Sequence, residues 1–225
     1  MSHLVVMFAK APVPGKVKTR LHTEFSPEAA AQLHGCFLRD QAARLLTARP
    51  GFEGWISVAG DSDHPVIAEI AAMGVRRVPQ PGDSLGDRMA CAVEMGLDEG
   101  YDSVTLIGSD SPTLPTAHID AAAEMMDRFD VAFGPSTDGG YVSVTTRRLL
   151  PVFREPIAWS TERTLIESLD AVRGAGLLAG LGAFWYDVDH AVDVAFLRRH
   201  LDLMGPGAEV VAPRTHAWLR SHPTG

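Results

Sequence analysis

Apolar residues along the chain form two kinds of pattern, short unbroken runs and longer stripes at helical spacing. The run from Leu4 to Phe8 has the length of one buried strand, and 104–107 is a second such run, predicted to be the central strand. A helix is predicted from Ser26 through Leu46, because a capping hydroxyl, a proline and an acid precede an apolar stripe. Such strands and helices alternate as far as Leu201.

The other elements follow from the same patterns. Strands are expected at 55–59, 75–78, 131–133, 141–145 and 183–186, and helices at 66–73, 87–98 and 116–128, through Leu165 and Leu169, and through Val194, Leu197 and Leu201. This alternation predicts a three-layer α/β/α fold with a mainly parallel sheet. We expect one domain over residues 1–225, in which 205–225 form a peripheral C-terminal arm.

Composition narrows the class of protein. Hydrophobic content of 46% and charged content of 21% are ordinary for a globular protein, and no apolar run has the ~20 residues of a membrane span. Because no signal peptide is recognised in the sequence, a cytoplasmic location is expected. The net charge of −8 argues against a general nucleic-acid binder. Cys36 and Cys91 form no CxxC and are interpreted as small buried hydrophobes.

Against this negative charge, a cationic loop follows the first strand. Prolines and Gly15 enforce a turn there, and then Lys16, Lys18 and Arg20 occupy alternate positions. In an extended segment these three cations would share one side. The loop is neither a Walker A nor a GxGxxG motif. It is either a solvated basic turn or a loop that binds a nucleotide's phosphates, and we favour the second.

Polar, glycine-rich loops follow several of the predicted strands. In an α/β sheet, ligands bind at the carboxyl ends of the strands, so these loops should converge on one face. They span 10–20, 80–86, 108–112, 138–140 and 187–189.

Three aspartates at strand ends are candidate metal ligands. Asp110 follows the central strand, and Asp187 and Asp189 follow the late one. Carboxylates brought together in this way suit Mg²⁺ or Mn²⁺ better than zinc, with substrate phosphates completing the coordination. The alternatives are a turn or cap for Asp110 and a helix N-cap for Asp189.

Other motifs have plain structural interpretations. Asp138, Gly139 and Gly140 could form an ordinary hairpin turn or let a ligand lie against bare backbone. Histidines such as His34, His118 and His190 lack metal-ligand spacing and are interpreted as surface or packing residues. The segment 108–112 lacks the closing glycine of a nucleophile elbow, which argues against acyl hydrolysis.

Taken in order, these motifs resemble a known family. The segments are FAKAPVPGKVKTRL, QPGDSLGDRM, LIGSDSPTLP, GPSTDGGYVSV, WST and YDVDHAVDV. They are similar to the bacterial glycosyltransferase-like family of nucleotide-diphospho-sugar transferases, catalogued as a domain of unknown function or a radical-SAM-associated "transferase 1". Its wider relatives are GT-A fold nucleotidyltransferases, including molybdenum-cofactor nucleotidylyltransferases and phospholactate guanylyltransferase. The resemblance runs from about Leu4 to Leu201 and implies the GT-A fold.

The resemblance also implies roles for particular residues. Asp110 matches the metal-binding aspartate after the central strand, and Asp189 the second metal carboxylate, with Asp187 beside it. Asp138 is a candidate general base on the acceptor side, and Asp110, Lys16 and Arg20 are further catalytic candidates. The other matches are to the nucleotide and phosphate loop (Ala9, Gly15, Lys16, Lys18, Arg20), to the loop that borders the base (Gln80, Gly86) and to the acceptor-side loop (Asp138, Gly139, Gly140, Tyr141).

Two positions depart from the family pattern. Thr113 stands where the family often has an acid, and His190-Ala191-Val192-Asp193 stands where it commonly has Thr-Pro-Glu-Asp. Both departures bear on the metal geometry and leave the expected fold unchanged.

The expected activity is metal-dependent transfer from a nucleotide-activated donor to a small-molecule acceptor. A nucleotide-sugar glycosyltransferase is favoured. The alternative is a nucleotidyltransferase that moves NMP from an NTP to a phosphorylated small molecule and releases pyrophosphate. A third possibility is a nucleotide-binding module without catalysis. No nucleic-acid or membrane partner is expected.

Overall fold

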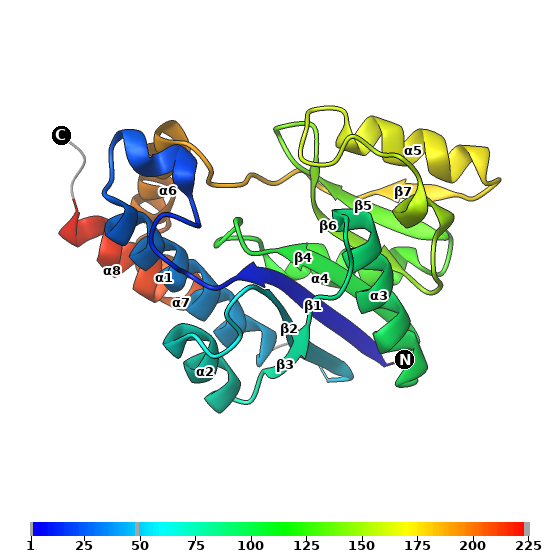
Figure 1. Cartoon of the computed structure of the whole chain (residues 1–225), viewed down its shortest axis with the longest axis horizontal. Helices are drawn as coiled ribbons and strands as arrows, with labels where there is room; N and C mark the ends of the chain where they lie inside the picture. The colour runs from blue at the N-terminus through cyan, green and yellow to red at the C-terminus, as the bar shows by residue number, and fades with distance from the viewer. Residues whose placement is uncertain (1, 48–49, 223–225) are drawn as a thin grey trace.

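A seven-stranded sheet organises the chain, with β1 (His3–Lys10) near its middle (Figure 1). The strand order is β3-β2-β1-β4-β6-β5-β7, and every pairing is parallel except the two made by β6. This computed structural model describes residues 2–47 and 50–222. The remaining strands are β2 (Phe52–Ala59), β3 (Arg76–Pro79), β4 (Ser103–Gly108), β5 (Val131–Pro135), β6 (Tyr141–Thr146) and β7 (Ala179–Leu181).

Helices cover both faces of the sheet and give the three layers expected from the sequence. One face packs against α3 (Leu85–Asp98), α5 (Thr164–Gly174) and the short 3₁₀ helix η2 (Pro151–Arg154). The other face packs against α1 (Pro27–Leu45), α2 (Pro65–Ala72) and α4 (Thr116–Met125). The remaining helical segments are η1 (Thr19–Thr23), α6 (Ala191–Met204), η3 (Gly205–Gly207), α7 (Ala208–Val211) and α8 (Pro213–Ser221).

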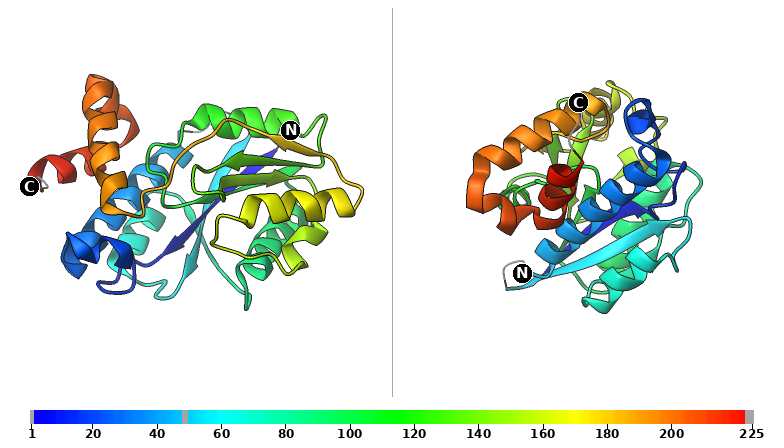
Figure 2. Two further views of the ribbon diagram at one scale, coloured as in Figure 1. Left: turned by 90° about the horizontal axis from the view of Figure 1, so that it is seen from above. Right: turned by 90° about the vertical axis from the view of Figure 1, so that its left-hand side faces the viewer.

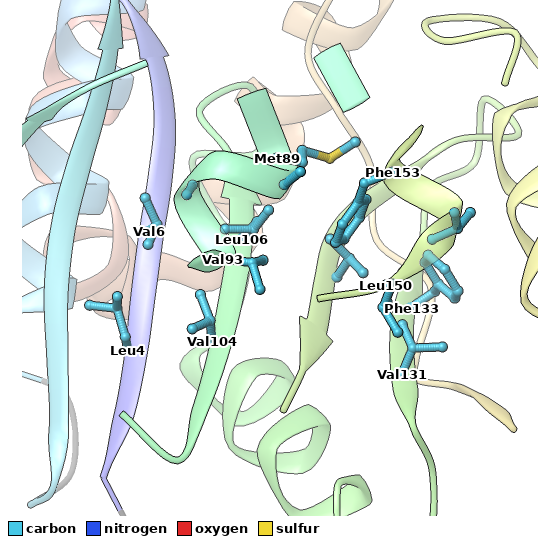
Figure 3. Packing of buried hydrophobic residues seen from close by; sticks show 14 of the residues in the cluster. Leu4, Val6, Met89, Val93, Val104, Leu106, Val131, Phe133, Leu150 and Phe153 are labelled. Atoms are coloured by element: carbon cyan, nitrogen blue, oxygen red, sulfur yellow. The ribbon is translucent and has the colours of Figure 1, made fainter. Parts of the chain in front are cut away.

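The alternation of side chains along β1 explains how one strand serves two cores. Leu4 and Val6 point into the cluster under α3, as Figure 3 shows, whereas Val5 and Met7 belong to the cluster under α1 and α2. Because both faces of β1 are buried, its sequence is a continuous apolar run without alternation.

The C-terminal helices lie against the outer side of α1, beside the sheet rather than on it (Figure 2). Asp40 of α1 is buried and accepts hydrogen bonds from the backbone N–H groups of Arg214 (3.2 Å) and Thr215 (2.8 Å) at the start of α8. Leu219 is fully buried in the same cluster. The arm expected at 205–225 is therefore helical and packed in its described part, 205–222.

One predicted element is wrong. The late strand expected at 183–186 lies earlier, at β7, and 183–186 contribute only an isolated bridge between Trp185 and Ser136. The aromatic side chains there pack against other rings and, for Trp185, against the core on one face of the sheet: Trp185 contacts His118 edge to face, and Tyr186 stacks on Trp185. The apolar run reflects these contacts and not strand pairing.

Candidate functional site

A cleft of about 570 Å³ opens at the carboxyl edge of the sheet. Four of the five polar loops contribute to it, together with His34 and Ser160. The fifth loop, with Asp138 and Gly140, lines a smaller hollow of about 160 Å³ in which Asp187 also lies. Leu85 and Ser160 line both spaces, so the hollow adjoins the cleft.

Lys18 joins the two aspartates that were expected at this edge. Its Nζ atom lies 2.5 Å from Asp110 Oδ1 and 3.1 Å from Asp189 Oδ1, and it donates a hydrogen bond to the backbone carbonyl of Val188 at 2.7 Å. The Lys18 side chain is only 4% exposed, and its ammonium lies over the ring of Phe37. The ammonium therefore sits between two carboxylates at the floor of the cleft.

The backbone of the loop explains this inward position. Gly15 has φ of +76°, Lys18 itself is left-handed (φ 49°, ψ 38°), and η1 starts at the next residue. The segment is therefore turned and not extended. All three cations still line the cleft: Lys16 is exposed there, and Arg20 Nη1 lies 3.0 Å from Asp189 Oδ2.

Backbone hydrogen bonds hold the two aspartate loops together. The N–H of Val188 donates to the carbonyl of Asp110 at 2.9 Å. Asp193 Oδ2 accepts from the N–H groups of Asp189 (3.0 Å) and His190 (2.7 Å), which fixes the turn before α6. This start of α6 therefore positions Asp189 without the Thr-Pro-Glu-Asp of the family pattern.

His34 is a residue of the cleft that the sequence interpretation missed. It is buried, and its Nε2 atom donates to the carbonyl of Lys10 at 3.2 Å. This bond leaves Nδ1 unprotonated; Nδ1 lies 3.8 Å from Asp110 Oδ1 and has no hydrogen-bond partner. The available signal was position, since His34 lies on the stripe of α1 that includes Leu38 and Gln41, whose Nε2 donates to Ser109 O at 2.8 Å.

The charges of the cleft depend on one another. Burial would raise the pKa of the Asp110 carboxyl, but the neighbouring basic groups, Lys18 foremost, together outweigh burial and lower the pKa. Burial likewise opposes the charge of Lys18, yet Asp110 and Asp189 raise its pKa. Burial lowers the pKa of His34 to about 4, so its imidazole is neutral at pH 7. At neutral pH the Asp110 carboxylate and the Lys18 ammonium are therefore charged, beside a neutral imidazole.

Asp187 makes no recorded contact with the Lys18 ammonium among the described residues, although the charge of Asp110 contributes to its raised pKa. Its two carboxylate oxygens accept hydrogen bonds from the hydroxyls of Ser111 (2.5 Å) and Ser136 (2.8 Å). Burial raises the pKa of Asp187 to about 6. Both oxygens are therefore hydrogen-bonded to serine hydroxyls, and Asp187 lines the hollow and not the cleft.

The other predicted residues divide between the two spaces and the scaffold. Ala9 and Gln80 line the cleft, and Gly140 and Tyr141 line the hollow. The lining does not include three of the predicted glycines, Gly15, Gly86 and Gly139.

Packing explains two of these glycines, and a hydrogen-bond pair explains Thr113. A Cβ at Gly86 would meet the carbonyl oxygen of Phe153 at 2.1 Å, and one at Gly139 would meet that of Glu162 at 2.3 Å. Thr113 is buried, donates to the Tyr186 hydroxyl at 3.0 Å and accepts from Trp185 at 3.3 Å. Thr113 therefore supports the aromatic pair and does not line the cleft.

Two further features of the described residues concern a metal ion and a membrane. Within 2–47 and 50–222, no three or more His, Cys, Asp or Glu side chains are grouped so as to hold a metal ion. None of the helices in this part of the chain combines the length and apolar character needed to cross a membrane.

Comparison with known proteins gives one family match. Residues 42–161 match the model of a family described as "Uncharacterized protein conserved in bacteria (DUF2064)". A search of curated proteins found no match.

Solved structures resemble the chain over nearly its whole length. A "putative nucleotide-diphospho-sugar transferase" from Desulfovibrio desulfuricans G20 is 32% identical, with a TM-score of 0.85, and the match covers 98% of this chain and 95% of that one. CMP:2-keto-3-deoxy-manno-octonic acid synthetase complexed with CTP is 14% identical, with a TM-score of 0.54 over 90% of this chain and 99% of that one.

A third structure shares the fold at a similarly low sequence identity. Glucosyl-3-phosphoglycerate synthase from Mycobacterium tuberculosis, in complex with Mg²⁺ and UDP, is 13% identical, with a TM-score of 0.54 over 90% of this chain and 78% of that one. Similarity to the last two structures establishes the fold alone. It confirms the α/β fold class that the motifs implied, shared by nucleotidyltransferases and glycosyl-transferring enzymes.

Proposed function

The chain belongs to the bacterial DUF2064 family, and from this premise we propose that it is a metal-dependent transferase acting on a nucleotide-activated donor. One observation carries the proposal: Asp110 and Asp189, 79 positions apart, converge on a single cation, the ammonium of Lys18. Two carboxylates sharing a cation at the carboxyl edge of an α/β sheet are suited to activating a diphosphate.

The cationic side of the cleft would bind the donor's phosphates. Lys16 is exposed, lines the cleft and makes no ion pair that the structure records among the described residues. Lys10 and Arg88 also line the cleft, and Arg20 approaches it from beside Asp189. These side chains would bind and orient the diphosphate and offset the charge that develops on the leaving group.

The carboxylate pair fits a divalent cation. Mg²⁺ is commonly bound by one or two protein carboxylates together with substrate phosphates, so a third protein ligand is not required. Asp110 and Asp189 would hold the ion, and the position of Lys18 supports a cation at this point. The bound metal would supply electrostatic stabilisation of the departing nucleotide phosphate. We assign Asp187 to the hollow and not to the ion.

The lining of the hollow favours glycosyl transfer. Two carboxylates, Asp138 and Asp187, and the hydroxyls of Thr161 and Thr164 line it, whereas no Lys, Arg or His does. A phosphorylated acceptor would meet like charge there, but a hydroxyl would find acceptors for its proton. Asp138 Oδ1 accepts from the N–H of Gly140 at 2.9 Å, which orients its carboxylate.

In this account an acceptor hydroxyl attacks the anomeric carbon of a nucleotide sugar. The bond from that carbon to the diphosphate breaks, the nucleoside diphosphate leaves, and Asp138 takes the hydroxyl proton as general base. The second candidate is NMP transfer to a phosphorylated small molecule with release of pyrophosphate. It draws on the fold shared with an enzyme crystallised with CTP.

A thermal-shift panel tests the proposal. Nucleotides and nucleotide sugars are screened with Mg²⁺, Mn²⁺ or EDTA against the wild type, Asp110→Asn and Asp170→Asn. Asp170 is an exposed aspartate of α5, paired with Arg173, and serves as the matched control. A ligand that binds the folded chain raises Tm with its concentration over Kd. We expect a metal-dependent shift that Asp110→Asn abolishes and Asp170→Asn keeps.

The outcomes separate the candidates. If no nucleotide shifts the Tm, every nucleotide-based function is excluded. If the shift is equal in EDTA and in Asp110→Asn, the chain binds nucleotide without the metal-assisted chemistry, as a non-catalytic module would.

A further inference from the structure

The ammonium of Lys18 has no hydrogen-bonding capacity left. An ammonium has three N–H donors, and the three atoms around Lys18 Nζ are Asp110 Oδ1, Asp189 Oδ1 and the carbonyl oxygen of Val188, at 2.5, 3.1 and 2.7 Å. The side chain is 4% exposed, so water does not compete for these donors. In this arrangement Lys18 is engaged with the protein and is not presented to a phosphate.

The ammonium engages one oxygen of each carboxylate that the proposed divalent ion would use. Both carboxylates direct Oδ1 at the ammonium, and the second oxygen of Asp189 is paired with Arg20. A metal at this point would lie against a positive charge, which disfavours its binding. The ammonium and the metal therefore compete for one position.

We propose that Lys18 is a resident cation that fills the metal position until the donor's phosphates draw it away, so that the metal enters only together with the nucleotide. This inference rests on the proposed function and specifies the order in which the metal and the donor of that function bind. Phosphate oxygens offer Lys18 charge-assisted hydrogen bonds of the kind it makes to the carboxylates, so the exchange leaves no ammonium unpaired. The carboxylates then receive the metal in its place.

Two features support an exchangeable position. Lys18 has a left-handed backbone, which is a strained conformation for a residue other than glycine. In addition, Nδ1 of His34, 3.8 Å from Asp110 Oδ1, has no hydrogen-bond partner among the described residues. One buried acceptor beside the carboxylate pair is therefore unsatisfied in this arrangement.

Binding of Mn²⁺ without nucleotide tests the exchange. The free ion gives an electron paramagnetic resonance signal that is lost on binding, and it is titrated into the full chain with no nucleotide present. We expect weak binding by the wild type and an affinity higher by about tenfold or more for Lys18→Met and Lys18→Gln. Far-UV circular dichroism verifies that each variant is folded.

Two control variants make the test specific. Arg173→Met removes an exposed cation of α5 that does not line the cleft, so it should bind Mn²⁺ as the wild type does. The double variant Lys18→Met, Asp110→Asn should lose the gain. The inference is overturned if the wild type already binds one Mn²⁺ as tightly as Lys18→Met, or if neither folded Lys18 variant gains affinity.

The wild-type titration decides even where a substitution prevents folding, because tight nucleotide-free binding by the wild type contradicts the exchange directly. No nucleotide is present in any arm. Failure of every nucleotide to bind would therefore count against the proposed function and leave this result standing.

Discussion

Lys16, Lys18 and Arg20 line one cleft, yet each meets a different environment there. Lys18 is buried between Asp110 and Asp189, Arg20 is largely exposed beside Asp189, and Lys16 is exposed without a recorded ion pair. Of the three cations, Lys16 is therefore the one most readily available to an incoming phosphate. Alternation in the sequence indicated a shared side, but it could not separate these roles, because the turn at Gly15 and the left-handed Lys18 reorient the loop.

His34 gives the site a pH dependence whose sign follows from burial. Its pKa is about 4 in the folded chain and 6.5 in the absence of burial, so between these values the unfolded chain binds more protons. The contribution of His34 to stability should therefore fall as pH falls through this window, by up to about 3 kcal/mol, whereas Asp187, whose pKa is raised to about 6, contributes with the opposite sign. Urea unfolding at about pH 7 and about pH 5 measures the change.

The matched variant is His34→Gln, whose side-chain amide can still donate to the Lys10 carbonyl but does not titrate. We expect the stability of the wild type relative to this variant to be lower at about pH 5 than at about pH 7, whatever the variant's stability at neutral pH, because the opposing contribution of Asp187 is common to both proteins. An equal change in both proteins would show that His34 is not the titrating group.

At the scale of elements, the predictions succeeded where local pattern and environment agree. The helix from Ser26 and the run at Leu4 are both found, because their apolar residues face the cores that the pattern implied. Strand β7 could not be found in this way. It is short, and Gly180 packs against Met125 and Phe129 so closely that a Cβ would meet Met125 Cε at 2.3 Å. What marks this strand is the close packing at Gly180, and a pattern of hydrophobic residues does not detect such packing.

Gly86 is a second glycine whose packing role the sequence does not reveal. It was interpreted as part of a base-binding loop, and the structure places it in the first turn of α3, against the Phe153 carbonyl and the Trp159 ring. The adjoining residues Leu85 and Arg88 line the cleft. Gly86 thus sets how closely α3 approaches η2, and a sequence alone does not distinguish such a glycine from one that contacts a ligand.

The substitution Gly86→Ala tests this packing role. Its Cβ would lie 2.1 Å from the Phe153 oxygen and 3.0 Å from Trp159 Cζ2, so we expect a loss of about 1–3 kcal/mol or more in urea unfolding. The control is Gly174→Ala at the end of α5, where a Cβ meets nothing within 4 Å. It should be neutral or stabilising by up to about 1 kcal/mol. Equal effects of the two substitutions would contradict the close approach.

For the whole molecule, the most informative part of the sequence interpretation was the rule that ligands bind at the carboxyl ends of the strands of an α/β sheet. Loops that are far apart in the chain were expected at one edge of the sheet, and four of them do line one cleft. Two features were beyond that rule. The antiparallel direction of β6 depends on how it pairs with β4 and β5. The docking of α8 depends on Asp40, one of several polar residues buried on α1, and the sequence does not show which of them holds another helix.

The central claim is that Asp110 and Asp189 hold a cation that binds together with the donor's diphosphate. Isothermal titration calorimetry of the nucleotide that gives the largest thermal shift, in Mn²⁺ and in EDTA, tests it most directly. The account predicts that EDTA weakens binding by about tenfold or more and that Asp110→Asn, folded as judged by circular dichroism, shows the weak affinity in both buffers. Equal affinity in Mn²⁺ and EDTA, together with unchanged binding by Asp110→Asn, would contradict it.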